Sequence, residues 1–390
     1  MRILVAPDSF GGTLSAGQAA GAIAEGWHRT APEDQLELCP MSDGGPGFLD
    51  TLQAGLGGTL LSVTVPSPLG EPVPAAVLVV DADGVRTAYI ETAQAIGLPL
   101  VPLDRRDPTV TSTSGVGRLI EAALDAGARR IVVGLGGSAT NDAGAGMLGE
   151  LGVGPADALG AGGFHLGEVR PADLAGLVAV RERLSGIELI GAYDVDVPLL
   201  GLHGASGGFA AQKGATAEQA QELERSLGHF AQVVGQSLGS DLGRPDLLVG
   251  APRAPRLSTA AGTGAAGGLG FGLAVLGARL VPGSVVVAGA VGLAERIAAV
   301  ELVLTGEGTF DWQSLHGKVV QAVAARALDA AVPTVVLAGQ VTIGRREWGA
   351  AGIAGAYAVA TSDAEVTASL ADPSGTLAAR AARLARTWSH

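Results

Sequence analysis

Residues 131–144 read IVVGLGGSATNDAG, an apolar run that leads into a glycine-rich polar turn. The run Ile131–Leu135 is typical of a buried strand, and a helix is predicted to begin near Met147. Glycines in such a turn let backbone amides face outward, and a helix N-terminus behind them attracts a phosphate group. The turn matches neither the P-loop nor the dinucleotide-binding fingerprint. It therefore predicts an anion-binding turn between a strand and a helix.

Short β-rich runs alternate with Ala-rich helical segments at both ends of the chain, and this alternation predicts a parallel sheet with crossover helices. Ser15 and Gln18 have the spacing of a capping box, so a helix is expected to start there, and another near Phe48. The predicted strands at the two ends cover residues 2–6, 36–39, 302–304, 334–337 and 356–359.

The middle of the chain departs from this pattern. Val77–Val80 and Thr87–Glu91 flank Asp81-Ala82-Asp83-Gly84, which is a hairpin signal and implies antiparallel pairing. The predicted architecture is therefore α/β. One domain is made from residues 1–65 and 290–390, and a second, mixed α/β domain of residues 66–289 is inserted into it.

Composition and charge limit the class of protein and the partners. With 390 residues, 47% of them hydrophobic, the chain is long and apolar enough for two folded domains. The net charge of -13 disfavours nucleic acid and anionic membrane surfaces as partners. A single cysteine, Cys39, excludes a disulfide scaffold and points to a reducing compartment. Neither a secretory signal nor a membrane-spanning run is recognised, so a soluble cytoplasmic protein is expected.

Polar residues follow each predicted strand of the terminal domain. Asp8 and Ser9 follow the first strand, Asp43 the second, and Glu307 and Asp311 the strand at residues 302–304. Ligands of open parallel sheets bind beyond the carboxyl ends of the strands. Any one of these loops could be an ordinary surface turn, but several along one sheet edge favour a binding site.

Lysine usage is a second clue, because only two of the 25 basic residues are lysine, Lys213 and Lys318. Each stands next to a glycine, and a compact ammonium reaches phosphate oxygens in a cleft where a planar guanidinium does not fit. The alternative is that both lysines lie at surface positions where any residue is tolerated and are present by chance.

Asp194 and Asp196 follow the apolar run of residues 187–192, which places at least one carboxylate at a strand end. Such a carboxylate can take the proton of a substrate hydroxyl that attacks phosphorus, or help to hold Mg²⁺. A structural role, as the cap of a turn that contains proline, is equally compatible with the sequence.

At these motifs the chain resembles the bacterial glycerate kinase family, whose members phosphorylate D-glycerate with ATP and Mg²⁺. The resemblance runs from Ile3 to about Ser362, and its most specific block is the turn at residues 136–142 with Gly144-Ala145-Gly146-Met147. Supporting blocks are residues 6–10 (APDSF), 106–108 (RDP), 212–215 (QKGA), 264–268 (GAAGG), 305–308 (TGEG) and 315–318 (LHGK).

The resemblance implies a Rossmann-like terminal domain and an active site in the cleft between it and the inserted domain. It implies ATP-dependent phosphorylation of D-glycerate, with 2-phosphoglycerate as the expected product, by a phosphotransferase that uses an alcohol acceptor. A small hydroxylated metabolite is the expected partner, and the oligomeric state stays open, with a homodimer as the candidate.

Roles follow as hypotheses. The catalytic residues would be Asp194, Lys318, Glu307 and Asp311. The nucleotide would be bound by Gly136, Gly137, Ser138, Thr140, Asn141, Asp142 and Lys213. The acceptor would be bound by Asp8, Ser9 and Asp43, and Mg²⁺ by Asp194 and Glu307.

The chain departs from the family's usual pattern at four positions. Gly11 stands where the family has lysine, Thr309 where it has arginine, Pro46 where it has an acidic residue and Val197 where it has asparagine. Since a pocket that grips a carboxylate normally supplies a cation, three readings stay open. Glycerate is held by other groups, the acceptor is a different hydroxylated metabolite, or the protein is a catalytically inactive ligand-binding member of the fold.

Overall fold

The predicted strands at the two ends of the chain meet in one parallel sheet. The computed structural model describes residues 1–238 and 257–389, and these form two units. The first unit contains the described residues of Met1–Asp43, Asp50–Gly57 and Gly283–His390. The second contains those of Gly44–Leu49 and Gly58–Pro282. The two-domain α/β class is thereby confirmed, whereas the sequence-based boundaries at 65/66 and 289/290 stay a prediction.

The sheet of the first unit has the strand order β13-β11-β9-β1-β2, and every neighbouring pair is parallel. All five predicted strands are confirmed. The last one begins three residues earlier than expected, because Ala354 and Gly355 have little β propensity and hide its start in the sequence. The bounds are β1 Arg2–Val5, β2 Gln35–Leu38, β9 Leu302–Thr305, β11 Thr334–Ala338 and β13 Ile353–Ala358. A two-residue ribbon pairs β10 (Thr309–Phe310) with β12 (Gln340–Val341).

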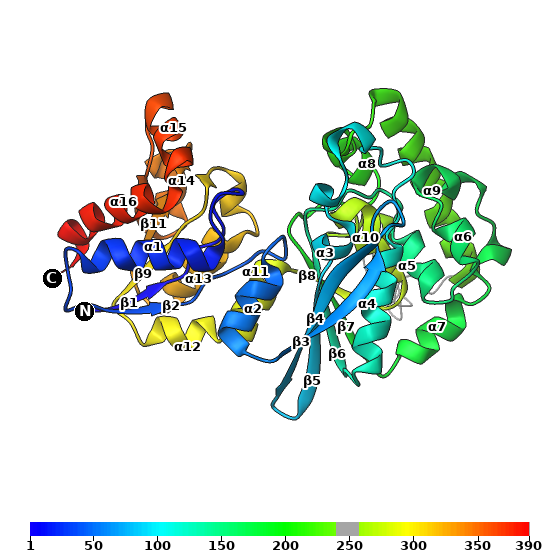
Figure 1. Cartoon of the computed structure of the whole chain (residues 1–390), viewed down its shortest axis with the longest axis horizontal. Coiled ribbons are helices and arrows are strands. Elements are labelled where there is room, and N and C mark those ends of the chain that lie inside the picture. Colours follow the sequence, from blue (N-terminus) through cyan, green and yellow to red (C-terminus); the bar gives the residue numbers. More distant parts are fainter. Residues whose placement is uncertain (239–256, 390) are drawn as a thin grey trace, which may run out of the picture. The chain divides into compact units, whose positions relative to one another are not determined.

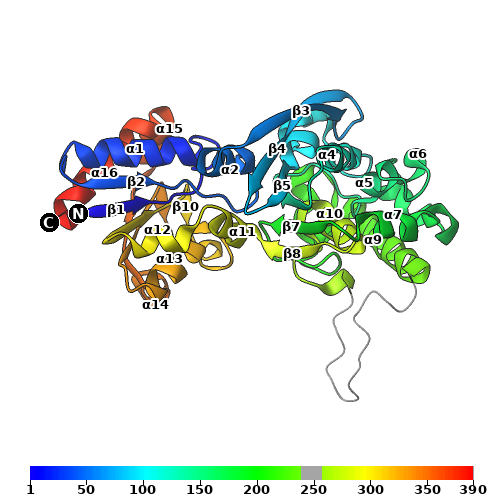
Figure 2. The same cartoon turned by 90° about the horizontal axis from the view of Figure 1, so that it is seen from below.

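Helices cover both faces of this sheet. Helices α1 and α16, drawn in blue and red, lie side by side in Figures 1 and 2 and pack on one face with residues of β1, β9 and β11. The predicted capping box at Ser15 and Gln18 is present and starts α1. The helices of this unit are α1 Ala16–His28, α11 Gly283–Ala290, α12 Leu293–Ala298, α13 Val319–Asp329, α14 Arg345–Ala350, α15 Asp363–Ala371 and α16 Pro373–Trp388, and α2 (Phe48–Leu56) runs from the second unit into the first.

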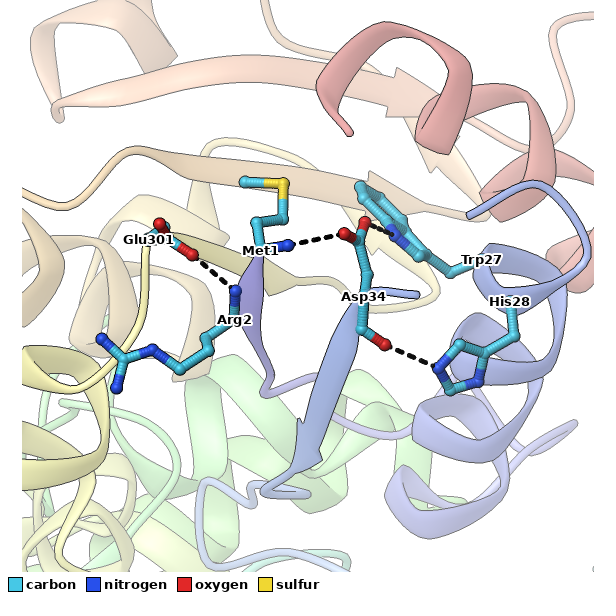
Figure 3. A network of polar contacts seen from close by, with 6 residues as sticks. All are labelled: Met1, Arg2, Trp27, His28, Asp34 and Glu301. Carbon is cyan, nitrogen blue, oxygen red and sulfur yellow. Dashed lines mark hydrogen bonds and ion pairs between the residues drawn. The ribbon is translucent and has the colours of Figure 1, made fainter. Parts of the chain in front are cut away.

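Asp34 is a buried carboxylate that ties the start of β1 to α1 (Figure 3). It accepts hydrogen bonds from the Met1 ammonium at 2.7 Å and from the indole N–H of Trp27 at 2.8 Å. His28 Nε2 lies 3.1 Å from its backbone oxygen. Burial alone would raise the pKa of Asp34, but the donated hydrogen bonds hold it below its usual value.

The second unit contains a six-stranded mixed sheet with the order β3-β4-β5-β6-β7-β8. The predicted hairpin is confirmed, since β4 and β5 are antiparallel and Asp83 and Gly84 at its tip both have positive φ, 52° and 75°. Strands β5 to β8 are parallel to one another. The bounds are β3 Thr59–Pro66, β4 Pro72–Ala82, β5 Val85–Glu91, β6 Arg130–Leu135, β7 Glu188–Tyr193 and β8 Arg279–Pro282.

Helices of the second unit pack around the parallel half of the sheet and enclose one large apolar core. In the described residues, none of the helices combines the length and the hydrophobicity that crossing a membrane requires. The helices of this unit are α3 Ala93–Ile96, α4 Ser114–Asp125, α5 Ala145–Glu150, α6 Ala156–Leu159, α7 Leu177–Leu184, α8 Ala205–Phe209, α9 Ala217–Leu238 and α10 Ala265–Val275.

The first prediction concerns Asp34. Asp34→Ala leaves the fully buried Trp27 indole N–H without an acceptor, so we expect the free energy of unfolding to fall by about 1–3 kcal/mol. Asp34→Asn keeps an acceptor oxygen and is expected to lose less. Urea unfolding of both variants measures the difference, and the exposed neighbour Glu33→Ala is the control, expected within about 0.5 kcal/mol of the parent. Equal stability of the parent and Asp34→Ala would contradict the role of this carboxylate.

Candidate active site

The glycine-rich turn joins β6 to α5, as the sequence predicts. Strand β6 ends at Leu135 and α5 starts at Ala145, two residues before the predicted start. Within the turn, Gly137, Ala143 and Gly144 have positive φ values of 70°, 53° and 77°. The backbone of Ala143 is strained in this conformation, because an alanine rarely adopts a positive φ without support from its surroundings.

Asp142 supplies much of that support. Its carboxylate is fully buried and accepts hydrogen bonds from the backbone and the hydroxyl of Thr113, both at 2.8 Å. It also accepts from the backbone N–H groups of Gly144 at 3.1 Å and Gly146 at 3.2 Å. Burial raises the pKa of Asp142 and these hydrogen bonds oppose the rise. The contacts make Asp142 a residue that holds the turn in shape.

A second left-handed segment packs against the turn. Ala266, Gly267 and Gly268 at the start of α10 have φ values of 51°, 67° and 90°. A Cβ on Gly267 would lie 1.8 Å from the backbone oxygen of Thr140, so only glycine permits this approach. The Gly267 carbonyl accepts a hydrogen bond from Ala143 N–H at 3.1 Å, which locks the two segments together.

The two segments border a cavity of about 350 Å³ in the second unit. Of the seven turn residues 136–142, three line it, namely Gly136, Gly137 and Ser138. Thr140, Asn141 and Asp142 are fully buried and are not among the lining residues. The other lining residues include Arg106, Asp194, Gln212, Lys213, Gly264, Ala266 and Gly267.

Lys213 brings a buried positive charge to this cavity. It ends a short 3₁₀ helix, Ala211–Lys213, and only 3% of its surface is exposed. Its Nζ donates hydrogen bonds to Ser138 Oγ at 2.9 Å and to the Thr140 carbonyl at 2.7 Å. Burial lowers the pKa of Lys213 to about 8, although Asp194 and Asp142 favour the charged form. An ammonium group that lines a cavity is suited to an anionic ligand.

Asp194 also lines the cavity and directly follows β7. The structure thus brings together two residues that the sequence singled out separately, Asp194 and Lys213. Arg106 and Gln212 were not predicted as site residues. Both lie in sequence blocks that carried the family resemblance, residues 106–108 and 212–215, and that signal could have found them.

In the first unit, carboxylates gather at the carboxyl ends of three adjacent strands. Asp8 follows β1, Asp43 follows β2 and Glu307 follows β9. Burial, and next the charge of Asp43, hold the pKa of Asp8 well above its usual value. Ser9 N–H donates to Asp8 Oδ1 at 2.6 Å and the nearby charge of Lys318 also counteracts the shift.

Glu307 is the most unusual of these carboxylates. Burial raises its pKa to about 7, while Ser314 and Lys318 oppose the rise. Its Oε1 is buried and has no hydrogen-bond partner within the described structure. A buried acceptor without a hydrogen bond lowers the stability of the fold unless a ligand or a cation binds to it.

Asp311 and Lys318 lie further along the same segment. Asp311 Oδ1 accepts from the N–H groups of Gln313 at 2.8 Å and Ser314 at 3.2 Å, so it caps the 3₁₀ turn that follows. Lys318 is the N-cap residue of α13, and its charge acts on both Asp8 and Glu307. Lys318 lies in the first unit, whereas Lys213, the other lysine of the chain, lies in the second.

The carboxylates suit a magnesium ion that is bound together with phosphates. Across the described parts of the chain, no three His, Cys, Asp or Glu side chains are grouped to hold a metal ion. Mg²⁺ needs no such cage, since it is usually held by one or two carboxylates together with water and substrate phosphates. The unpartnered oxygen of Glu307 fits a ligand of this kind.

Comparison with known proteins assigns the family. The profile of the glycerate kinase family matches residues 3–389. The chain belongs to the glycerate kinase family. Glycerate kinase of Bacillus subtilis is 42% identical over 88% of this chain and 86% of its own, and glycerate 2-kinase of Escherichia coli is 41% identical with the same coverage. A crystal structure of a putative glycerate kinase 2 from Salmonella typhimurium has a TM-score of 0.78 and 35% identity, covering 99% of this chain and 98% of that one.

The positions at which the resemblance predicts a departure from the family's pattern can be located in the structure. Gly11 and Thr309 line a cavity of about 160 Å³ in the first unit, and Pro46 lines the cavity of Lys213. Val197 accepts a backbone hydrogen bond from Gly264 at 2.9 Å. Three of these four positions thus line cavities.

The second prediction tests the locked turns. Gly267→Ala forces a methyl group against the Thr140 carbonyl oxygen, at a residue whose φ is positive. We therefore expect the free energy of unfolding to fall by more than about 2 kcal/mol and the cavity to be lost. Gly235→Ala in α9 has free space around its Cβ and is expected to be neutral or slightly stabilising. Thermal and urea unfolding compare the two variants. A Gly267→Ala protein as stable as Gly235→Ala would refute the close approach.

Proposed function

We propose that this protein phosphorylates glycerate with ATP and Mg²⁺, and that the 2-hydroxyl receives the phosphoryl group. One observation carries the proposal: a buried lysine, Lys213, lines a cavity together with a glycine-rich strand-to-helix turn. The names of the relatives, glycerate kinase and glycerate 2-kinase, support the choice of acceptor and of hydroxyl. The cytoplasm as compartment and a homodimer as assembly stay predictions.

The cavity of the second unit is assigned to the triphosphate. Its backbone turn at Gly136–Ser138 offers N–H groups, and the Lys213 ammonium and the Arg106 guanidinium offer charge. Phosphoryl transfer depends on positioning and charge neutralisation more than on covalent chemistry, so donors of this kind are what the reaction needs. The remaining polar residues of the turn are buried and hold its backbone in shape without contacting the nucleotide; they are Thr140, Asn141 and Asp142.

The acceptor is assigned to the carboxyl ends of β1, β2 and β9. Asp8, Ser9 and Asp43 are the proposed contacts for its hydroxyl groups, because carboxylates accept hydrogen bonds from alcohols. Lys318 is the proposed cation for its carboxylate or for a phosphate oxygen. Asp311, which caps a turn, holds the segment that carries Glu307 and Lys318.

Two carboxylates have the chemistry of catalysis. Asp194 is proposed to take the proton of the attacking hydroxyl. Glu307 and Asp194 would hold Mg²⁺, which when bound supplies charge neutralisation at the phosphates.

The third prediction concerns the lysine in the cavity. Lys213→Met removes charge-assisted hydrogen bonds that are worth about 1.5–3 kcal/mol each, so the KM for ATP should rise roughly 10- to 100-fold. Coupled ADP-release kinetics measure it. Above pH 8 the parent should lose ATP affinity as well, because the pKa of Lys213 is lowered to about 8 and the ammonium deprotonates there.

The matched control is Gln221→Met, an exposed position of α9 in the same unit, which should leave the KM unchanged. Lys318→Ala is expected to lose a similar factor in kcat/KM. Unchanged ATP kinetics in Lys213→Met would remove the main support for the nucleotide site.

The fourth prediction uses the raised pKa of Glu307. Only the ionised carboxylate holds a cation, so the Mg²⁺ concentration for half-maximal activity should fall as the pH rises through about 7. Glu307→Gln should need more Mg²⁺ than the parent above pH 7, approach the parent below it, and lose this pH dependence. The exposed Glu347→Gln is the control. A parent enzyme whose Mg²⁺ requirement is flat between pH 6 and pH 8 would argue against Glu307 as a ligand.

A further inference from the structure

The first unit contains a cavity of about 160 Å³ that the proposed mechanism does not use. Its walls are the loops that follow β1, β9, β11 and β13, four adjacent strands of the parallel sheet. Helices α15 and α16, in red in Figure 1, supply the remaining wall. The cavity therefore lies at the edge of the sheet where open α/β folds bind their ligands.

The described residues that line this cavity include no charged side chain. Apolar groups dominate, among them Leu14, Val366, Leu370 and Leu377. A few neutral polar groups, such as Thr309 and Gln340, accompany them. Leu370 is 63% exposed, so its side chain is available to a ligand. A surface of this kind binds an uncharged, mainly aliphatic group and disfavours an ion, whose desolvation would go uncompensated.

The strand order places this cavity next to the carboxylates assigned to the acceptor. The carboxylates follow β9, β1 and β2, whereas the cavity spans β13, β11, β9 and β1. Two shared strands carry both sets of groups: Glu307 is followed directly by the lining residues Gly308 and Thr309. An acceptor that lies along this edge can present its hydroxyls to the carboxylates and its carbon chain to the cavity.

We propose that the cavity binds a short uncharged carbon chain of the acceptor, so that the substrates include hydroxy acids longer than glycerate. This rests on the proposed function, because it extends the acceptor site of that same reaction. The volume corresponds to roughly five water-sized groups, which suits an extension of one to three carbons. A second carboxylate at the same place is rejected, since the walls offer it no cation.

The fifth prediction compares acceptors. The kcat/KM for 2,3-dihydroxybutanoate and 2,3-dihydroxyhexanoate, which extend glycerate by neutral carbons, should equal or exceed that for glycerate. Tartrate, which extends glycerate by a carboxylate, should be at least tenfold poorer. If glycerate is phosphorylated and the neutral homologues are at least tenfold poorer than glycerate, the inference is wrong and the proposed function stands.

Two variants on α15 connect the preference to the cavity. Leu370→Glu places a charge at the lining, whereas Ala371→Glu places the same charge on a neighbouring exposed residue outside it. The ratio of kcat/KM for 2,3-dihydroxyhexanoate to that for glycerate should fall at least fivefold in Leu370→Glu and stay unchanged in Ala371→Glu. An equal ratio in both variants would overturn the assignment.

If no acceptor is phosphorylated, the proposed function fails, and a binding measurement still tests whether the cavity takes an uncharged ligand. Saturation-transfer NMR with 1,2-pentanediol probes the cavity of the whole protein without any turnover. A signal that is present in the parent and in Ala371→Glu, but lost in Leu370→Glu, supports an uncharged ligand there. No signal from the parent overturns the inference.

Discussion

The approach of Gly267 to the Thr140 carbonyl is the constraint on which the larger cavity depends. No side chain fits between these two backbones, and both segments include an alanine in the left-handed conformation, which the surroundings must support. The hydrogen bond from Ala143 to Gly267 and the four donors to the Asp142 carboxylate keep them there. With the turn rigid, the Thr140 carbonyl and the Ser138 hydroxyl can position the Lys213 ammonium.

The two units distribute charge in opposite ways. The cavity of the second unit is lined by the buried Lys213 ammonium, by Arg106 and by the glycines of the turn, together with the single carboxylate Asp194. The sheet edge of the first unit concentrates carboxylates, and Asp8 and Glu307 have raised pKa values because they are buried and also because Asp43 lies near both. Such shifts gather at functional sites, since a group with its usual pKa needs no special surroundings. A kinase needs both kinds of surface, one for the triphosphate and one for the hydroxyl and the metal ion.

The neutral cavity in the first unit adds a second environment to the sheet edge that carries the carboxylates. Its side chains come from loops after four strands and from two helices near the C-terminus, so residues more than 300 positions apart, such as Gly11 and Leu370, meet in it. Two of the positions at which the chain departs from the usual family pattern, Gly11 and Thr309, lie here.

The sequence alone determined the local features. The alternation of strands and helices, the capping box at Ser15, the hairpin at Asp83-Gly84 and the strand-turn-helix at residues 131–147 each depend on neighbours in the chain, and short-range sterics and hydrogen bonds decide them. Only the tertiary structure decided which polar residues face a cavity. Asp142 and Asp194 look alike in sequence, yet one is saturated by buried donors and the other lines the cavity with Lys213, because burial and hydrogen bonding depend on segments far apart in the chain. The same holds for Arg106 and for the uncharged cavity, which exist only once distant loops pack together.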